Sequence, residues 1–411
     1  MKTSAKLAKT LTVIFLFLML SNLYSTENKD STSFKITFKG FVRSDVIFDS
    51  RQSVSAREGY VLLFPQKPIY DINGKDINEG VHLNQYAAGS RLIVAADQHV
   101  SSNFKIKIYL ESDFTGSSNS TYNNLRLRHA YVRIDKNKCF LLAGQFWHPL
   151  VAEDIFPDML SLNLGNPFKS AIRVPQMRFG VANYRNFDLY FTASTQIDNP
   201  SIGPDGSTTK YMRDAAVPNL TANIQKSHQN FKIGAVVDFK TLLFSNVDSV
   251  LGMQKTNLNS MAYSIYGKYE NPKFLFKTQF IYGENMFDHV MLGGLAQAEQ
   301  GYRFQSSQTA SGWINVFWKT PKMNLGFFAG YTENMGYKAA TNGSFFARGS
   351  DIHSVYRIAP HFMYKASSRL LFYSETELTT ANYGIPDAQG KISSFKAVSN
   401  LRENISVVFL F

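Results

Sequence analysis

The last eleven residues of the chain alternate between apolar and polar side chains and end on an aromatic residue. The apolar set is Ile405, Val407, Phe409 and Phe411, and the polar set is Arg402, Asn404 and Ser406. A period of two residues places the two sets on opposite faces of a β-strand. The C-terminus is therefore predicted to be a strand with one apolar face and one polar face.

A final strand that closes on a terminal Phe is typical of bacterial outer-membrane β-barrels, in which the insertion machinery reads that residue. We expect Phe411, Phe409 and Val407 to form this assembly signal. On the lipid-facing parity, the terminal aromatic would join the girdle at the periplasmic rim. The expected surroundings of such a barrel are membrane lipid and lipopolysaccharide.

The N-terminus predicts export from the cytoplasm. Lys2, Lys6 and Lys9 precede an apolar run from Leu11 to Leu20, and small and polar residues follow up to Ser25. The apolar run is too short for a membrane span, so residues 1–25 are interpreted as a signal peptide. Residues 26–411 then form one domain.

Composition agrees with strands that cross a membrane. The chain is 44% hydrophobic, with 34 Phe and 21 Tyr, yet no later stretch approaches the roughly 18 apolar residues of a transmembrane helix. Alternation hides lipid-facing residues among polar ones, which keeps the mean hydropathy slightly negative. A soluble chain this aromatic would need a large core built from continuous apolar runs.

Sixteen segments are predicted to be strands of a closed antiparallel transmembrane barrel. They lie near 34–48, 88–97, 103–114, 124–135, 138–147, 175–184, 187–197, 217–226, 230–242, 259–270, 273–284, 310–319, 322–333, 351–364, 368–381 and 397–411. Tight turns such as 135–138 and 184–187 alternate with connections of roughly ten to forty residues. Short periplasmic turns and long extracellular loops are the pattern of outer-membrane barrels. A β-sandwich shares the residue alternation but explains the long strands poorly.

Each predicted strand has an apolar and a polar face. In 34–48, Phe38, Val42 and Val46 oppose Lys39 and Arg43. In 103–114, apolar residues such as Ile108 alternate with polar residues such as Lys107 and Glu111. Apolar faces are expected to meet lipid and polar faces a wet lumen.

The connection at residues 148–174 is the predicted constriction loop. Glu153, Asp154 and Asp158 stand there among apolar residues such as Phe156 and Leu160. Apolar content suggests a loop packed inside the barrel, because sixteen strands leave a channel wider than side chains fill. The alternative is an extracellular loop with ordinary solvated acids.

Basic residues gather on the lumen parity and form the predicted pore lining. They are Arg43, Lys107, Arg126, Arg128, Arg178, Arg357 and Arg402. Guanidinium groups bind carboxylate or phosphate through a two-pronged fork, and a basic wall in a confined pore favours anions. We expect the acids of the constriction loop to stand across the channel from Arg43, Arg126, Arg128 and Arg178. Alternatively, lumen acids such as Asp45, Asp49, Glu111 and Asp113 neutralise these arginines.

Charge and motifs narrow the function classes. The net charge of +12 falls to +9 once Lys2, Lys6 and Lys9 are removed, but an exported chain rarely meets nucleic acid, so anionic solutes and lipopolysaccharide phosphates are the expected partners. The eight histidines show no metal-ligand spacing and no nucleophile motif is present, so we expect no enzyme, cofactor or metal. His129 takes the outward parity of its strand, which suits a subunit interface.

Three segments resemble DcaP-like trimeric outer-membrane porins. Residues 38–49 (FKGFVRSDVIFD) resemble the opening strand, and 125–132 (LRLRHAYV) and 142–147 (LAGQFW) resemble the fourth and fifth strands. The resemblance implies a homotrimer of sixteen-stranded barrels that passes small, often anionic solutes, with Arg43, Arg126 and Arg128 lining the pore. The periplasmic coiled coil common in that family has no counterpart in the few residues between the expected cleavage site and the first strand.

The sequence therefore predicts an outer-membrane porin for passive diffusion of small hydrophilic, preferentially anionic solutes. The alternative is a barrel-anchored surface-binding protein or adhesin, which residues 49–87 could serve, with a turn at Asn73-Gly74.

Overall fold

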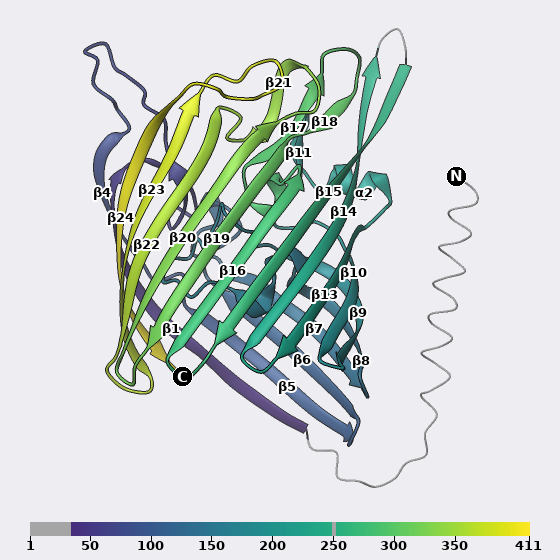
Figure 1. Ribbon diagram of the computed structural model, residues 1–411, viewed down its shortest axis with the longest axis vertical. Coiled ribbons are helices and arrows are strands. Elements are labelled where there is room, and N and C mark those ends of the chain that lie inside the picture. Colours follow the sequence, from purple (N-terminus) through teal and green to yellow (C-terminus); the bar gives the residue numbers. More distant parts are fainter. Residues whose placement is uncertain (1–33, 249–251) are drawn as a thin grey trace.

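The computed structural model describes residues 34–248 and 252–411, and the predicted signal peptide lies outside these ranges. The described chain forms a closed antiparallel barrel (Figure 1). Its strands are β1 (Phe34–Arg51), β4 (Glu79–Tyr86) with β5 (Arg91–Ser101), β6 (Phe104–Asp113), β7 (Arg126–Lys136), β8 (Cys139–Trp147), β9 (Arg173–Tyr184), β10 (Phe187–Ser194), β13 (Asn219–His228), β14 (Phe231–Asp248), β15 (Gly252–Glu270), β16 (Phe274–Glu284), β19 (Gln308–Lys319), β20 (Met323–Gly336), β22 (Ile352–Lys365), β23 (Leu370–Gly384) and β24 (Phe395–Leu410).

Strands β4 and β5 together act as one barrel strand. The lower half of β1 pairs with β5, from Phe34 opposite Gln98 to Phe41 opposite Arg91. The upper half of β1 pairs with β4 in the same direction. Counted this way, the barrel has sixteen strands, as the sequence predicted.

The connections also follow the prediction. Two-residue turns such as Asn137-Lys138 close one end of the barrel, and the long connections gather at the other end, where β14 and β15 rise above the rim (Figure 1). The long connections carry β2 (Ser53–Ala56), β3 (Val61–Pro65), β11 (Ile202–Gly203), β12 (Gly206–Ser207), β17 (Gly293–Ala298), β18 (Phe304–Ser306), β21 (Thr341–Arg348), α2 (Lys210–Ala215) and the short η1 (Asn119–Thr121), η2 (Pro149–Val151), η3 (Glu153–Ile155) and η4 (Phe287–His289). Among the described residues, no helix is long and apolar enough to cross a membrane.

Alternation gives the barrel wall its two faces. On β1, Val42 and Val46 are exposed on the outer face, whereas Arg43, Asp45 and Asp49 are buried on the inner face. On β6, Ile108 and Leu110 are exposed and Glu111 is buried. An apolar outer band and a polar inner wall are what lipid and an aqueous lumen require.

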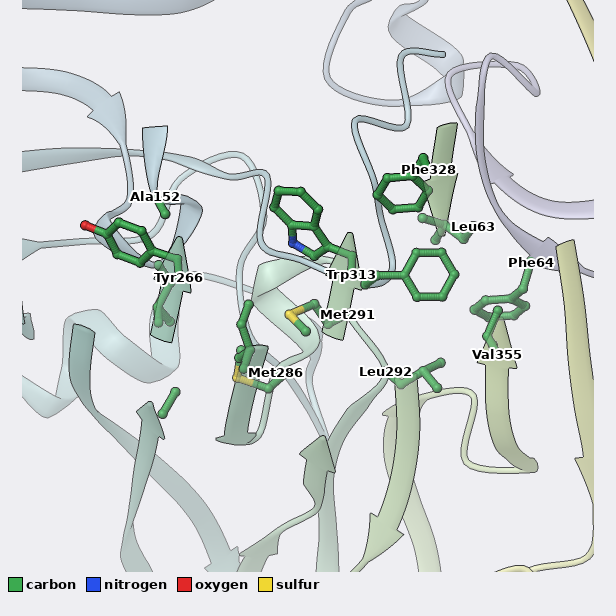
Figure 2. Close-up of a cluster of buried hydrophobic side chains, with 14 of the residues drawn as sticks. Leu63, Phe64, Ala152, Tyr266, Met286, Met291, Leu292, Trp313, Phe328 and Val355 are labelled. Carbon is green, nitrogen blue, oxygen red and sulfur yellow. The ribbon is translucent and has the colours of Figure 1, made fainter. Parts of the chain in front are cut away.

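One side of the lumen is filled by an apolar core. Figure 2 shows Leu63, Phe64 and Ala152 from two long connections in one cluster with Trp313 of β19 and Phe328 of β20. Trp313 and Phe328 stack with ring centroids 6.0 Å apart. These apolar side chains face inward because inward-folded loops, not water, cover them. The expectation that apolar faces meet lipid is therefore wrong for these residues.

The barrel closes where β1 meets β24. Gly40 and Phe411 exchange two backbone hydrogen bonds, with N–O distances of 3.0 and 3.1 Å. A Cβ at Gly40 would lie 2.2 Å from the backbone oxygen of Arg91 and 2.9 Å from the Phe411 ring, so glycine allows β5 and the terminal aromatic to approach β1 closely. Phe411 thus joins the first strand to the last.

We expect deletion of Phe411 to lower the amount of folded protein in outer membranes. The variant loses both backbone hydrogen bonds at the seam and the terminal aromatic of the expected assembly signal. The measurement is the heat-modifiable band of isolated outer membranes on a gel. Native membrane levels after the deletion would contradict an assembly role for Phe411.

Candidate functional site

The connection between β8 and β9, here called L3 (residues 148–172), lies inside the barrel. The carboxylate of Glu375 on β23 accepts hydrogen bonds from the backbone N–H groups of Leu160 and Ser161, both at 2.9 Å. Phe168 packs on Gly330 of β20, where a Cβ would lie 2.5 Å from the ring. These contacts hold L3 against the β20–β23 wall.

Each of the three acids of L3 forms an ion pair with a basic residue of the adjacent barrel wall. Glu153 contacts Arg178 at 3.0 Å. Asp154 contacts Lys232 at 2.6 Å and Asp158 contacts Lys277 at 2.7 Å. Four arginines are expected to stand across the channel from these acids. Of these four, only Arg178 forms an ion pair with an acid of L3, and its partner Glu153 is in direct contact with it.

The connection between β1 and β4, here called L1 (residues 52–78), also enters the barrel in part. Fully buried Arg357 donates hydrogen bonds to the backbone oxygens of Leu62 and Leu63 in L1 and of Asn166 in L3. Arg402 donates to the backbone oxygen of Gly59 at 2.8 Å. The first half of L1 is therefore fixed inside the lumen, whereas the adhesin alternative treats residues 49–87 as a surface loop.

All six arginines of the predicted pore lining lie on the inner face and have a carboxylate partner. The pairs are Arg43 with Asp45, Arg126 with Asp113, Arg128 with Glu111 and Asp113, Arg178 with Glu153, Arg357 with Glu377, and Arg402 with Asp49. Lys107 instead lies over the Tyr109 ring, with its Nζ 5.5 Å from the ring centroid. Most of the predicted arginine charge is thus balanced locally.

A cavity remains between L1, L3 and the upper ends of β6, β7 and β9. Its volume is about 100 Å³. Its charged lining residues are Arg57, Arg126, Arg128, Arg173, Asp113 and Asp198. Four guanidinium groups and two carboxylates give this cavity a net charge of two positive units.

Two of these arginines, Arg57 and Arg173, are absent from the predicted pore lining. Arg57 lies in L1, and Arg173 is the first residue of β9, where the sequence placed the end of a loop. Arg91 of β5, 3.5 Å from Glu111, is a third basic residue on this wall that the prediction omitted. Strand parity finds residues inside strands, but it carries no signal for a loop that folds back into the lumen.

His129 faces inward, so its predicted outward orientation is wrong. The register between β6 and β7 shifts at Glu111, which pairs with His129, while Ser112 pairs with Leu127. This β-bulge reverses the parity of the upper end of β7. The His129 ring lies 5.1 Å from that of Trp147 and is buried, so it does not contribute to the outer surface.

Three residues far apart in the sequence meet near the start of L3. The ligand atoms of His148, Asp238 and His289 lie within 4.8 Å of one another. Nδ1 of His148 accepts the Leu150 N–H at 3.2 Å, and its Nε2 lies 2.8 Å from the side-chain nitrogen of Asn219 and 3.4 Å from Asp238. Both ring nitrogens of His148 thus already contact groups of the described chain. The geometry therefore favours a hydrogen-bonded network that ties L3 to β14.

Comparison with known proteins supports the fold. No protein-family model matches the chain, and no curated protein matches it. The crystal structure of the outer membrane channel DcaP of Acinetobacter baumannii has a TM-score of 0.69 at 16% identity and covers 95% of this chain and 100% of that chain. An anion-selective porin from Comamonas acidovorans has a TM-score of 0.57 at 10% identity, covering 92% and 100%.

The trimer form of OmpT from Vibrio cholerae has a TM-score of 0.55 at 11% identity, covering 92% of this chain and 100% of that chain. Sequence identities this low establish the shared architecture but do not identify a transported solute. The DcaP-like resemblance of the sequence motifs agrees with this architecture. The chain has the fold of these outer-membrane channels and porins.

Proposed function

We propose that the protein is a porin of the bacterial outer membrane that allows passive diffusion of small hydrophilic solutes and prefers anions. The apolar outer face suits a lipid bilayer, and the fold is shared with outer-membrane channels. No step of this function requires a cofactor. We further propose a homotrimer, on the DcaP-like resemblance and on the trimer form of the similar OmpT.

The observation that carries the anion preference is the cavity between L1 and L3. Its four arginines exceed its two carboxylates, and this lining lies between two loops that narrow the lumen. A confined space with a net positive lining raises the local concentration of anions. L1 and L3 would act together as the constriction, with the apolar core closing the opposite side of the lumen.

The proposal is tested by swelling of liposomes that contain the purified protein. Gluconate should enter faster than the uncharged gluconamide of nearly equal size, and glucosamine should enter more slowly. Equal rates for the three solutes would contradict the anion preference. No swelling with any solute would contradict the porin and favour the barrel-anchored adhesin, whose surface would then be the exposed part of L1 near Ile72.

A further inference from the structure

The tip of the L1 hairpin is a turn with three successive residues at positive φ. Arg57, Glu58 and Gly59 have φ angles of 61°, 56° and 88°. A non-glycine residue in this region is strained and persists only where the surroundings enforce it. Here Tyr86 donates a hydrogen bond to the Glu58 backbone oxygen at 2.6 Å. The hydrogen bond from Tyr86 on β4 thus fixes the turn to the barrel wall, and the turn places Arg57 in the lining of the cavity.

Arg57 and Arg173 present guanidinium nitrogens without a hydrogen-bond partner. Arg57 is 9% exposed and Arg173 is 6% exposed. Nη1 of Arg57 and Nε of Arg173 are buried and make no hydrogen bond to any described residue. Arg173 stacks on the Trp147 ring, 4.3 Å from its centroid. Buried donors are nearly always satisfied, so these two indicate a missing acceptor.

The surroundings favour an anionic acceptor. Burial and the charge of Arg126 lower the pKa of Arg57 to about 10, and Asp198 and Asp113 offset this only in part, so the guanidinium is charged at neutral pH but lacks full compensation. Asp113 and Asp198 line the same cavity, yet neither forms an ion pair with Arg57 or Arg173 within the described chain. An oxyanion would supply both the negative charge and the hydrogen-bond acceptors that these groups lack.

We propose that Arg57 and Arg173 form an oxyanion-binding site between L1 and L3, which takes a carboxylate or phosphate group of a solute in transit. The site deepens the proposed porin function, on which it rests, by giving the constriction a binding step in addition to a general positive field. Arg57 would contact the anion from L1, and Arg173, which stacks on Trp147, would contact it from the barrel wall. The planar fork of each guanidinium matches the oxygens of such groups.

The test measures how inorganic phosphate, and separately acetate, reduces single-channel chloride current in planar bilayers. We expect both anions to block the native channel and the Arg57→Gln, Arg173→Gln double variant to need about ten-fold more of each, as for lost charged hydrogen bonds. Arg57→Lys, which keeps the charge but loses the fork, should lie between them. Arg213→Gln is the matched control, because Arg213 is exposed and pairs only with Asp214 among the described residues.

An unchanged blocking concentration in the double variant, with channels of native conductance, would overturn the site. A loss of block in Arg213→Gln equal to that in the double variant would also overturn it. Equilibrium binding of phosphate to the detergent-solubilised single variants, measured by calorimetry, provides a second readout if the double variant does not fold. Failure of the native protein to form any channel would instead contradict the proposed porin function.

Discussion

Replacing both Arg126 and Arg128 with alanine should shift the selectivity of the pore from anions toward cations, because the net charge of the cavity lining falls from two positive units to zero. Asp113 accepts hydrogen bonds from both arginines, at 2.7 Å from each, and Glu111 accepts from Arg128. The double variant removes two of the four cavity arginines, and it leaves Arg91, 3.5 Å away, as the remaining ion-pair partner of Glu111. The readout is the reversal potential in a potassium chloride gradient at low salt, which should lose the chloride preference of the native channel.

The difference between the variant and the native channel should fade at high salt, because the screening length falls to about 3 Å at 1 M. The variant should also unfold at a lower temperature than the native protein, because Asp113 and Glu111 are left buried with fewer partners. Arg213→Ala on the exposed extracellular loop serves as the control and should preserve the native sign. An unchanged reversal potential in the double variant would mean that ion selectivity is set elsewhere in the lumen.

Replacing Arg402 with methionine should produce the largest loss of stability. Arg402 is fully buried and donates to both oxygens of Asp49 on β1, at 2.9 and 2.7 Å. The same side chain donates to the backbone oxygens of Gly59 and Tyr60, so it joins the barrel seam to L1. Removing one member of a buried ion pair costs about 3–5 kcal/mol.

The measurement is the temperature at which the folded band disappears in a heat-modifiability series. Arg369→Met, at an exposed position in the turn between β22 and β23, should leave that temperature unchanged. Because Arg402 also anchors L1, its variant should show noisier single-channel currents than the native protein. An Arg402→Met variant as stable as the native protein would show that the buried pair does not hold the seam.

The barrel could be predicted from the sequence because lipid imposes a strict rule on each strand. Val42 and Val46 must face outward if Arg43 and Asp45 face inward, and a period of two reports this directly. Short turns between such segments then give strand count and direction. The same rule failed at His129, because a β-bulge adds one residue and no composition signal marks it.

The interior could be predicted only in part, because its contacts join residues that are far apart in the sequence. Alternation indicated that Arg357 faces inward, but not that it holds backbone oxygens of both L1 and L3. Trp313 is inward and apolar because L3 covers it, which strand parity cannot report. The apolar content of L3 did predict a loop suited to packing. L1 carries a comparable apolar run at residues 61–65, of which Leu62, Leu63 and Phe64 are buried, but the prediction did not use it.

The most direct test of an anion-preferring pore is the reversal potential of the native protein in planar bilayers under a potassium chloride gradient. The net positive cavity between L1 and L3 predicts discrete channels whose reversal potential has the sign of chloride preference and moves toward zero as salt rises. Channels with potassium preference at low salt, or bilayers that show no channels although the protein is folded, would contradict it.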